Sequence, residues 1–352
     1  MIPNISHISP SHCSKNPRGQ IRFTNVGDLL GFVKWFRYSS PSKKRYKELE
    51  ILLKLQNHPN IVKLLAAGPD YQNGILEYIV TEFASEGDLY HLIHRRRSVE
   101  YNLANALSWM SQLSEAVAFL HERSSIPIIH RDVKPANCLI LNEGARLQLC
   151  DFGSAESPDL PEPMSPTRRG TAGFMAPELF SIDSATPVNY TVKSDVFSVA
   201  MTFWEVLARQ HVCPPDEPFF VTLVQLVHKH RRPHPLQGCP VFLLRLLERS
   251  WSEHPEERPR MSEVADLLNC IKTRILDQGA QELEVSSPSP VLLKPLELSI
   301  ICDDSDIESK KASGALRDIA LLATQQMAKL FISTTGSKIR RAVPFLILST
   351  LK

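Results

Sequence analysis

The spacing of apolar positions changes once along the chain. Between about residues 20 and 83, short β-branched and apolar runs are typical of strands, and they cover residues 20–25, 29–36, 61–67 and 75–82. Residues 43–55 have instead the spacing of a helix. The pattern therefore predicts a small, mainly β lobe with one helix.

Helical periodicity dominates from about residue 103 to residue 275. In residues 103–120, apolar side chains recur at intervals of three and four, as in a buried helix: Leu103, Leu107, Met110, Leu113, Val117 and Leu120. The same spacing predicts helices at residues 194–209, 221–230, 241–251 and 261–275. The predicted fold class is α+β with two lobes: a mainly β N-lobe over about residues 19–83 and a larger, mainly helical C-lobe over about residues 84–275.

The two ends of the chain fall outside this domain. Residues 1–18 form a short N-terminal segment, and residues 276–352 are rich in serine, proline and acidic residues, which predicts a flexible tail. Residues 314–332 carry one helical apolar stripe: Leu316, Ile319, Ala323, Met327 and Leu330. We interpret this stripe as a helix that docks in a partner's groove. The alternatives are that it packs on the helical lobe or is a marginal helix in solution.

Composition narrows the class of protein. The chain has 352 residues, 43% of them hydrophobic, which is enough for a substantial core. With 40 basic and 38 acidic residues it has no general attraction to nucleic acid. Its seven cysteines are scattered without a Cys-x-x-Cys pair, so we expect reduced thiols. There is no signal-peptide pattern and no apolar run of roughly 18 residues, so a cytoplasmic protein without a membrane span is expected.

A first group of polar residues has the spacing of a phosphoryl-transfer loop. In HRDVKPAN, residues 130–137, Asp132 precedes Asn137 by five residues with Lys134 between them. Phosphoryl transfer needs a carboxylate that orients and deprotonates a hydroxyl, together with oxygen ligands for magnesium. Asp132 is the predicted base, Asn137 a metal ligand, and Lys134 a cation that stabilises the transferred phosphoryl group. The alternative is a helix-capping aspartate beside surface basic residues.

Further motifs follow in a fixed order. Asp151-Phe152-Gly153 comes fourteen residues after Asn137, with Asp151 as a second magnesium ligand and Gly153 as the residue that lets the chain turn. By itself this tripeptide is an ordinary turn, but its distance from the first motif argues against coincidence. The segment GTAGFMAPE occupies residues 170–178, and SDVFS and PEERPRM contribute Asp195 and Arg258.

Together these motifs resemble the eukaryotic protein kinases over about residues 19–275. The resemblance implies a buried structural pair between Glu178 and Arg258, and an Asp195 that braces the backbone of the catalytic loop. It also implies ATP and magnesium as cofactors. Lys134 and Thr171 are similar to the serine/threonine branch, in which a threonine hydroxyl faces the catalytic aspartate and lysine.

The phrases HPNIVKL, SEGDLYHLIH, CDFGSA, GFMAPELF and SDVFSVAMTFWEVLAR resemble the transforming-growth-factor-β-activated kinase group of mitogen-activated protein kinase kinase kinases. That resemblance implies a stress or immune MAP kinase cascade, a MAP kinase kinase as substrate, and an adaptor protein bound through the C-terminal tail. Arg131, next to Asp132, implies a segment that is ordered by a phosphate on Ser165, Thr167 or Thr171.

The nucleotide-binding part of the pattern is weaker. Of the family's glycine-rich G-x-G-x-x-G-x-V loop only Gly19 and Ile21 remain, because Ser14 and Asn16 occupy the two earlier glycine positions. Lys34 is the predicted anchor of the ATP phosphates. The residue two before it is Phe32 rather than a small alanine, and its ring is expected to crowd the adenine pocket.

Counting along the family pattern leaves two acidic partners for Lys34. Glu48 is preferred because it shares a helical face with inward apolar residues, whereas Glu50 is expected to face solvent.

The resemblance also implies a hinge for adenine, formed by the residues that follow the last N-lobe strand. Thr81 would lie at the entrance to the pocket behind adenine, and the backbones of Glu82 and Ala84 would contact adenine. Leu139 would lie beneath the adenine ring. Asp88 would bind the ribose, or it simply caps the following helix.

The sequence thus favours a serine/threonine protein kinase that transfers the γ-phosphate of Mg-ATP to a signalling protein. The alternative is a pseudokinase or scaffold that acts by binding proteins. Intact metal ligands favour the enzyme, whereas the degenerate glycine loop and Phe32 favour the scaffold.

Overall fold

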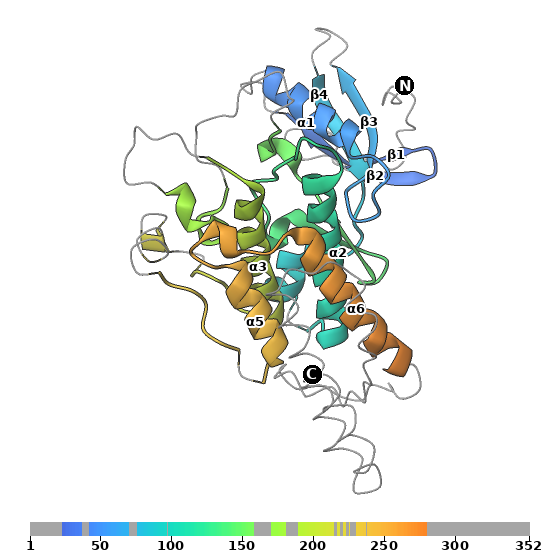
Figure 1. Cartoon of the computed structure of the whole chain (residues 1–352). Helices are drawn as coiled ribbons and strands as arrows, with labels where there is room; N and C mark the ends of the chain where they lie inside the picture. Colours follow the sequence, from blue (N-terminus) through green and yellow to red (C-terminus); the bar gives the residue numbers. More distant parts are fainter. Residues whose placement is uncertain are drawn as a thin grey trace, which may run out of the picture.

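The computed structural model describes residues 23–36, 42–69, 76–96, 98–157, 170–180, 189–214, 217–218, 221–222, 225, 230–236 and 238–279. A small sheet with one helix lies above a larger group of helices (Figure 1). The two-lobed α+β fold predicted from the spacing of apolar residues is therefore confirmed.

The small lobe is an antiparallel sheet with the strand order β1-β2-β4-β3. Its strands are β1 (Phe23–Val26), β2 (Leu29–Trp35), β3 (Leu64–Pro69) and β4 (Leu76–Glu82), and its helix is α1 (Ser42–Lys54). Ile51, Leu52 and Leu55 are buried beneath the sheet, as the spacing of their helix predicted. The predicted run 20–25 begins outside the described residues, and the predicted run 61–67 starts three residues before β3 does.

In the central strand pair of this sheet, Phe32 lies opposite Thr81 and Lys34 lies opposite Ile79. Cross-strand partners point to the same face of a sheet, so Phe32, Thr81 and Lys34 belong to one face. Gly31 is required where β2 pairs with β4, because a Cβ at that position would lie 2.5 Å from the Val80 side chain.

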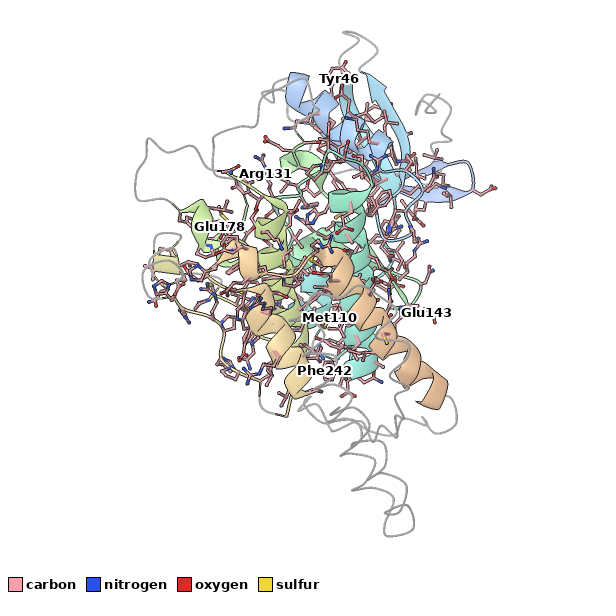
Figure 2. The ribbon with its side chains drawn as sticks, viewed as in Figure 1. Tyr46, Met110, Arg131, Glu143, Glu178 and Phe242 are labelled. Atoms are coloured by element: carbon pink, nitrogen blue, oxygen red, sulfur yellow. The ribbon has the colours of Figure 1, made fainter. Side chains whose placement is uncertain are left out.

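The large lobe is built on α2 (Leu103–Glu122) and α3 (Val192–Ala208), with α5 (Val241–Ser250) and α6 (Met261–Gly279) packed beside them (Figure 1). Met110, on α2, lies within this lobe (Figure 2). Helix α6 runs past the predicted limit at residue 275, and most of the predicted helix 221–230 lies outside the described residues. None of the helices in the described ranges is both long enough and apolar enough to cross a bilayer.

A two-stranded hairpin, β5 (Cys138–Leu141) and β6 (Arg146–Leu149), joins the lobes. The Leu149 amide donates to the Asn60 carbonyl at 2.8 Å, and the Val62 amide donates to the Leu149 carbonyl at 3.0 Å. The buried Asn60 side chain donates in turn to Gln112 of α2 at 2.9 Å. This bonding holds the end of β6, and with it Asp151, between the two lobes.

Candidate active site

The backbone that precedes Asp132 is held by a buried carboxylate. Asp195, in the first turn of α3, accepts hydrogen bonds from the amides of His130 at 2.8 Å and Arg131 at 2.9 Å, and from the His121 ring at 3.0 Å. Burial favours the neutral acid, but the bonds and charges of the histidines outweigh it and hold the pKa of Asp195 below its usual value. Arg131 has a left-handed backbone, φ 66°, which these bonds stabilise.

Asp132, Lys134 and Thr171 form a closed triangle of polar contacts. The Lys134 Nζ lies 2.8 Å from Asp132 Oδ2 and 2.8 Å from the Thr171 hydroxyl, which donates to Asp132 Oδ1 at 3.1 Å. Asn137 Nδ2 also donates to Asp132, at 2.7 Å to the carbonyl and 3.1 Å to Oδ2. A hydroxyl oxygen is thus held between a carboxylate and an ammonium, as deprotonation of an alcohol requires.

Lys34 meets two carboxylates from different elements. Its Nζ lies 2.6 Å from Glu48 Oε1 on α1 and 2.6 Å from Asp151 Oδ1. Glu48 is only 4% exposed, whereas Glu50 faces solvent. Burial lowers the pKa of Lys34, but the two carboxylates outweigh burial and raise it. Burial raises the pKa of Asp151, but Lys34 outweighs it and lowers it, so both groups are charged at neutral pH.

The turn at Asp151 differs from the one expected. Asp151, not Gly153, has the left-handed backbone, with φ 61° and ψ 69°. Gly153 is needed for a different reason: a Cβ there would lie 3.2 Å from Glu48 Oε2 and 3.6 Å from Lys34 Nζ. Phe152 is buried and its ring meets the edge of His130 at 5.0 Å. The glycine therefore lets the backbone approach the Lys34–Glu48 pair.

Asn137 and Asp151 supply oxygen atoms of the kind that magnesium prefers. The Asn137 amide nitrogen donates to Asp132, which leaves the side-chain oxygen as the atom for a cation. The Cys150 amide donates to the Asn137 carbonyl at 2.9 Å, and this bond fixes Asp151 beside Asn137. Since Asp151 is ionised and partly exposed, this donor set fits a magnesium ion.

Aromatic rings gather on the side of the cleft where adenine is expected. Phe32 is 42% exposed and lies 5.8 Å, centroid to centroid, from Phe23, which meets Phe83 at 5.1 Å. Phe83 follows Glu82, so β1, β2 and the predicted hinge each contribute one ring. The three rings thus form one aromatic cluster that includes Phe32, the residue expected to crowd adenine.

Glu82 and Asp88, which were also predicted to lie near the nucleotide, bind other groups of the chain in this structure. The Glu82 amide donates to the Lys63 carbonyl, and its carboxylate pairs with Arg146 at 2.6 Å. Asp88 accepts from the His91 amide at 2.8 Å, so its carboxylate caps the turn that follows, the alternative to a ribose contact. Gly19 and Ile21 lie outside the described residues.

Leu139 and Ala84 lie at the entrance to the large lobe. An isolated bridge pairs Asp88 with Leu139, and the Ile140 amide donates to the Gly87 carbonyl at 2.8 Å. Ala84 is buried and Leu139 is partly buried. This arrangement brings Leu139 close to the segment that was predicted to contact adenine.

Arg131, which was predicted to pair with a phosphate, has partners within the chain in this structure. Its Nε donates to the Ser154 carbonyl at 2.6 Å, and its Nη2 lies 3.0 Å from Glu156 Oε1. Ser165 and Thr167 lie outside the described residues. Sequence reasoning missed Glu156, although an acidic residue three positions after Asp-Phe-Gly was visible as a possible partner for an arginine.

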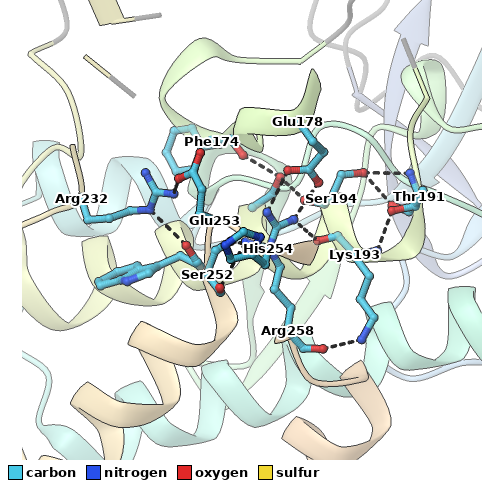
Figure 3. Close-up of polar contacts among 12 residues, drawn as sticks. Phe174, Glu178, Thr191, Lys193, Ser194, Arg232, Ser252, Glu253, His254 and Arg258 are labelled. Carbon is cyan, nitrogen blue, oxygen red and sulfur yellow. Dashed lines mark hydrogen bonds and ion pairs between the residues drawn. The ribbon is translucent and has the colours of Figure 1, made fainter. Parts of the chain in front are cut away.

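Glu178 and Arg258 form a two-pronged ion pair behind the site (Figure 3). Arg258 Nη1 and Nη2 donate to the two carboxylate oxygens at 2.7 and 2.8 Å. Arg258 also donates to the carbonyls of Lys193 and Ser252, each at 2.9 Å, and its side chain is fully buried. This pair ties the segment after Thr171 to α3 and to the start of α6.

One cluster away from the cleft has metal-ligand residue types. His94, Glu205 and His211 bring one ligand atom each within 4.8 Å of one another. However, the two imidazole rings stack with their centroids 3.7 Å apart and 13° between their planes, so their lone pairs lie in nearly parallel planes and do not converge on one point. His94 instead shares a hydrogen bond with Glu205 at 3.0 Å. We interpret the cluster as packing of the large lobe.

Comparison of the sequence with known proteins shows a family and several relatives to which this chain is similar. A model of the protein kinase domain matches residues 33–267. The chain is 36% identical to mitogen-activated protein kinase kinase kinase 7 of Drosophila melanogaster over 242 residues, which are 69% of this chain and 34% of that protein. It is 34% identical to the protein of the same name from Mus musculus over 292 residues, 82% of this chain and 45% of the relative. Mitogen-activated protein kinase kinase kinase mom-4 of Caenorhabditis elegans is 31% identical over 249 residues, 71% of this chain and 44% of the relative. The chain thus spans less than half the length of these relatives.

Proposed function

The chain belongs to the protein kinase family, and on that basis we propose that it transfers the γ-phosphate of Mg-ATP to a serine or threonine hydroxyl of another protein. The resemblance to the mitogen-activated protein kinase kinase kinases, first seen in short phrases of the sequence, is confirmed by the relatives. The activity itself is our inference from the site.

The single observation that carries this proposal is the Asp132–Lys134–Thr171 triangle. It holds a hydroxyl between a carboxylate at 3.1 Å and an ammonium at 2.8 Å. A substrate hydroxyl in a similar position would give its proton to Asp132, while Lys134 would stabilise negative charge on the transferred group. A carboxylate and an ammonium on either side of a hydroxyl suit transfer of a phosphoryl group to an alcohol.

The remaining charged residues have supporting roles in the proposal. Lys34, oriented by Glu48, would hold the ATP phosphates, and Asn137 with Asp151 would hold magnesium. When bound, the metal supplies positive charge that offsets the charge of the phosphates. Asp195 keeps the backbone of the catalytic loop in place and touches none of the reacting groups.

The cellular role is proposed from the relatives. We propose that the chain acts in a MAP kinase cascade, in a stress or immune setting, with a MAP kinase kinase as its substrate. We further propose a cytoplasmic location and an adaptor protein that binds residues 314–332, a segment outside the described residues.

The proposal is tested by transfer of labelled phosphate from ATP to a generic protein substrate. Asp132→Asn and Asp151→Asn should each lower the rate by about 10²-fold or more, because each removes a charge from the site without leaving a cavity. Glu256→Gln is the matched control, since Glu256 is largely exposed and lies between α5 and α6 of the large lobe. Wild-type rates in either aspartate variant would show that the assignment is wrong.

A scaffold without transfer is the second candidate, and the rings of Phe23, Phe32 and Phe83 favour it. Mg-ATP at about 100 times its Kd should stabilise a nucleotide-binding protein by about 2.7 kcal/mol, which a thermal-shift titration detects. A shift in Phe32→Ala combined with none in the wild-type protein would identify the ring as a block to ATP, and would favour the scaffold.

A further inference from the structure

Glu156 lies at a junction of three functional segments. Its side chain is 2% exposed, and one of its oxygens, Oε1, lies 3.0 Å from Arg131 Nη2 and 3.0 Å from Lys47 Nζ. Arg131 adjoins Asp132 in the catalytic loop, and Lys47 adjoins Glu48 on α1. A single buried carboxylate therefore joins the catalytic loop to the helix that orients Lys34.

Further contacts hold Arg131 and Glu156 in place at this junction. Its guanidinium lies 4.9 Å from the centre of the Tyr190 ring, and its Nε donates to the Ser154 carbonyl at 2.6 Å. Glu156 itself is held by paired backbone bonds with Ile129, at 2.7 and 2.8 Å. Figure 2 places Arg131 at the level where the lobes meet. Hydrogen bonds and a ring contact thus fix both Arg131 and Glu156 at this junction.

The negative charge of Glu156 offsets the positive charges of Arg131 and Lys47. Without it, the buried Arg131 and the partly exposed Lys47 would be like charges facing one point, and such a pair repels where water is largely excluded. The repulsion would act on α1 next to Glu48, and so on the 2.6 Å contact that orients Lys34. In kinases that have an arginine before the catalytic aspartate, a phosphate on the following segment supplies the negative charge at such a place.

We propose that Glu156 is a positioning residue for phosphoryl transfer, and that its carboxylate supplies the negative charge a phosphate would otherwise bring. Glu156 acts through Arg131 and Lys47 and touches no substrate. Transfer by this chain then needs no phosphate on the segment that follows Glu156. The proposal rests on the proposed kinase activity, and it replaces the expectation that a phosphate pairs with Arg131.

The test compares steady-state transfer to a peptide by the full chain, before and after treatment with a broad-specificity phosphatase whose completeness is checked by intact mass. Wild-type kcat should change by less than about twofold on dephosphorylation. Glu156→Gln should lower kcat by about tenfold to hundredfold with little change in the KM for peptide, as expected when catalytic groups are misplaced by about 1 Å. Glu156→Asp, which keeps the charge, should recover part of the loss.

Two further variants separate positioning from general loss of structure. Lys47→Met should lower kcat in the same direction, and its effect should be smaller in the Glu156→Gln background, because the two residues act through one contact. Glu50→Gln removes an exposed carboxylate from the same helix and should leave kcat unchanged. Wild-type kcat in Glu156→Gln, or a loss of tenfold or more in the wild-type protein on dephosphorylation, would overturn the proposal.

Hydrogen exchange gives a reading that does not depend on transfer. Amides of α1 should exchange at least about tenfold faster in Glu156→Gln than in the wild-type protein, and should be unchanged in Glu50→Gln. If the wild-type protein transferred no phosphate in either state, the proposed function would fail, and equal exchange in Glu156→Gln and the wild-type protein would then reject the junction as well.

Discussion

Replacing Arg258 with methionine tests whether the ion pair behind the site stabilises the large lobe. Arg258 makes two bonds to Glu178 and one each to the carbonyls of Lys193 and Ser252, and its guanidinium lies 5.2 Å from the centre of the Phe197 ring (Figure 3). Methionine fills much of the same volume but donates no hydrogen bond. The substitution therefore leaves a carboxylate and two carbonyls without these donors.

The expected cost follows from this contact set. Breaking a buried ion pair by removing one partner costs about 3 to 5 kcal/mol, to which unpaired carbonyls contribute. Glu178 is partly exposed and can be rehydrated, so the lower end, about 3 kcal/mol, is the better figure. For a domain of this size about 2 to 4 °C of Tm is lost per kcal/mol, which predicts a fall of roughly 6 to 12 °C.

Thermal and urea unfolding of the purified chain would measure the loss. Arg245→Met is the matched control, because Arg245 also pairs with a glutamate, Glu248, at 2.9 Å but is 60% exposed. Its loss should stay within about 0.5 kcal/mol. In a cycle with Glu178→Gln, the double variant should lose at least about 1 kcal/mol less than the sum of the single variants. Equal Tm values for the two arginine variants would refute the reasoning.

Two further predictions concern the acid range and the tail. The pKa of Asp195 is depressed in the folded protein, so its stabilisation is complete above the ordinary value of about 3.9 and is lost as pH falls through the folded pKa. Asp195→Asn should therefore have a much lower Tm than the wild-type protein at pH 7, with the gap narrowing as pH falls below about 4; a gap that does not change with pH would contradict this. For the tail, a segment containing residues 314–332 should capture a protein from cytosolic extract, and Ile319→Asp with Met327→Asp should abolish capture, because each aliphatic side chain buried in a groove contributes about 1.5 to 3 kcal/mol. Capture of the same proteins by both segments would reject the docking helix.

Local patterns were sufficient to predict most elements of the described structure. The helices at residues 43–55 and 103–120 appear as α1 and α2 with ends shifted by at most two residues, because a stripe of apolar side chains must face a core wherever that core lies. Strand β4 was predicted to within one residue, because a short run of apolar and β-branched side chains is typical of a strand. The motif around Asp132 could also be identified from the sequence, since phosphoryl transfer needs those residue types at short spacing.

The preference for Glu48 over Glu50 followed from the helical face that Glu48 shares with inward apolar residues, and Glu48 is the buried residue of the two. The sequence did not indicate that Lys34 Nζ would lie 2.6 Å from both Glu48 and Asp151, because that contact depends on how α1 packs beneath the sheet. The backbone at Asp151 is a second case, because the sequence indicated a turn at Gly153 whereas the left-handed residue is Asp151. These two features could not be derived from neighbours in sequence.

The sequence by itself determined the two-lobed fold, the catalytic loop and the order of its motifs, because these depend on periodicity and on residues a few positions apart. Only the tertiary structure decided that Glu156 occupies the place between Arg131 and Lys47, since these three residues come together from segments up to 109 positions apart. Charge at such a junction acts over a few ångströms in a region that excludes water, and which charges meet there depends on how the lobes pack.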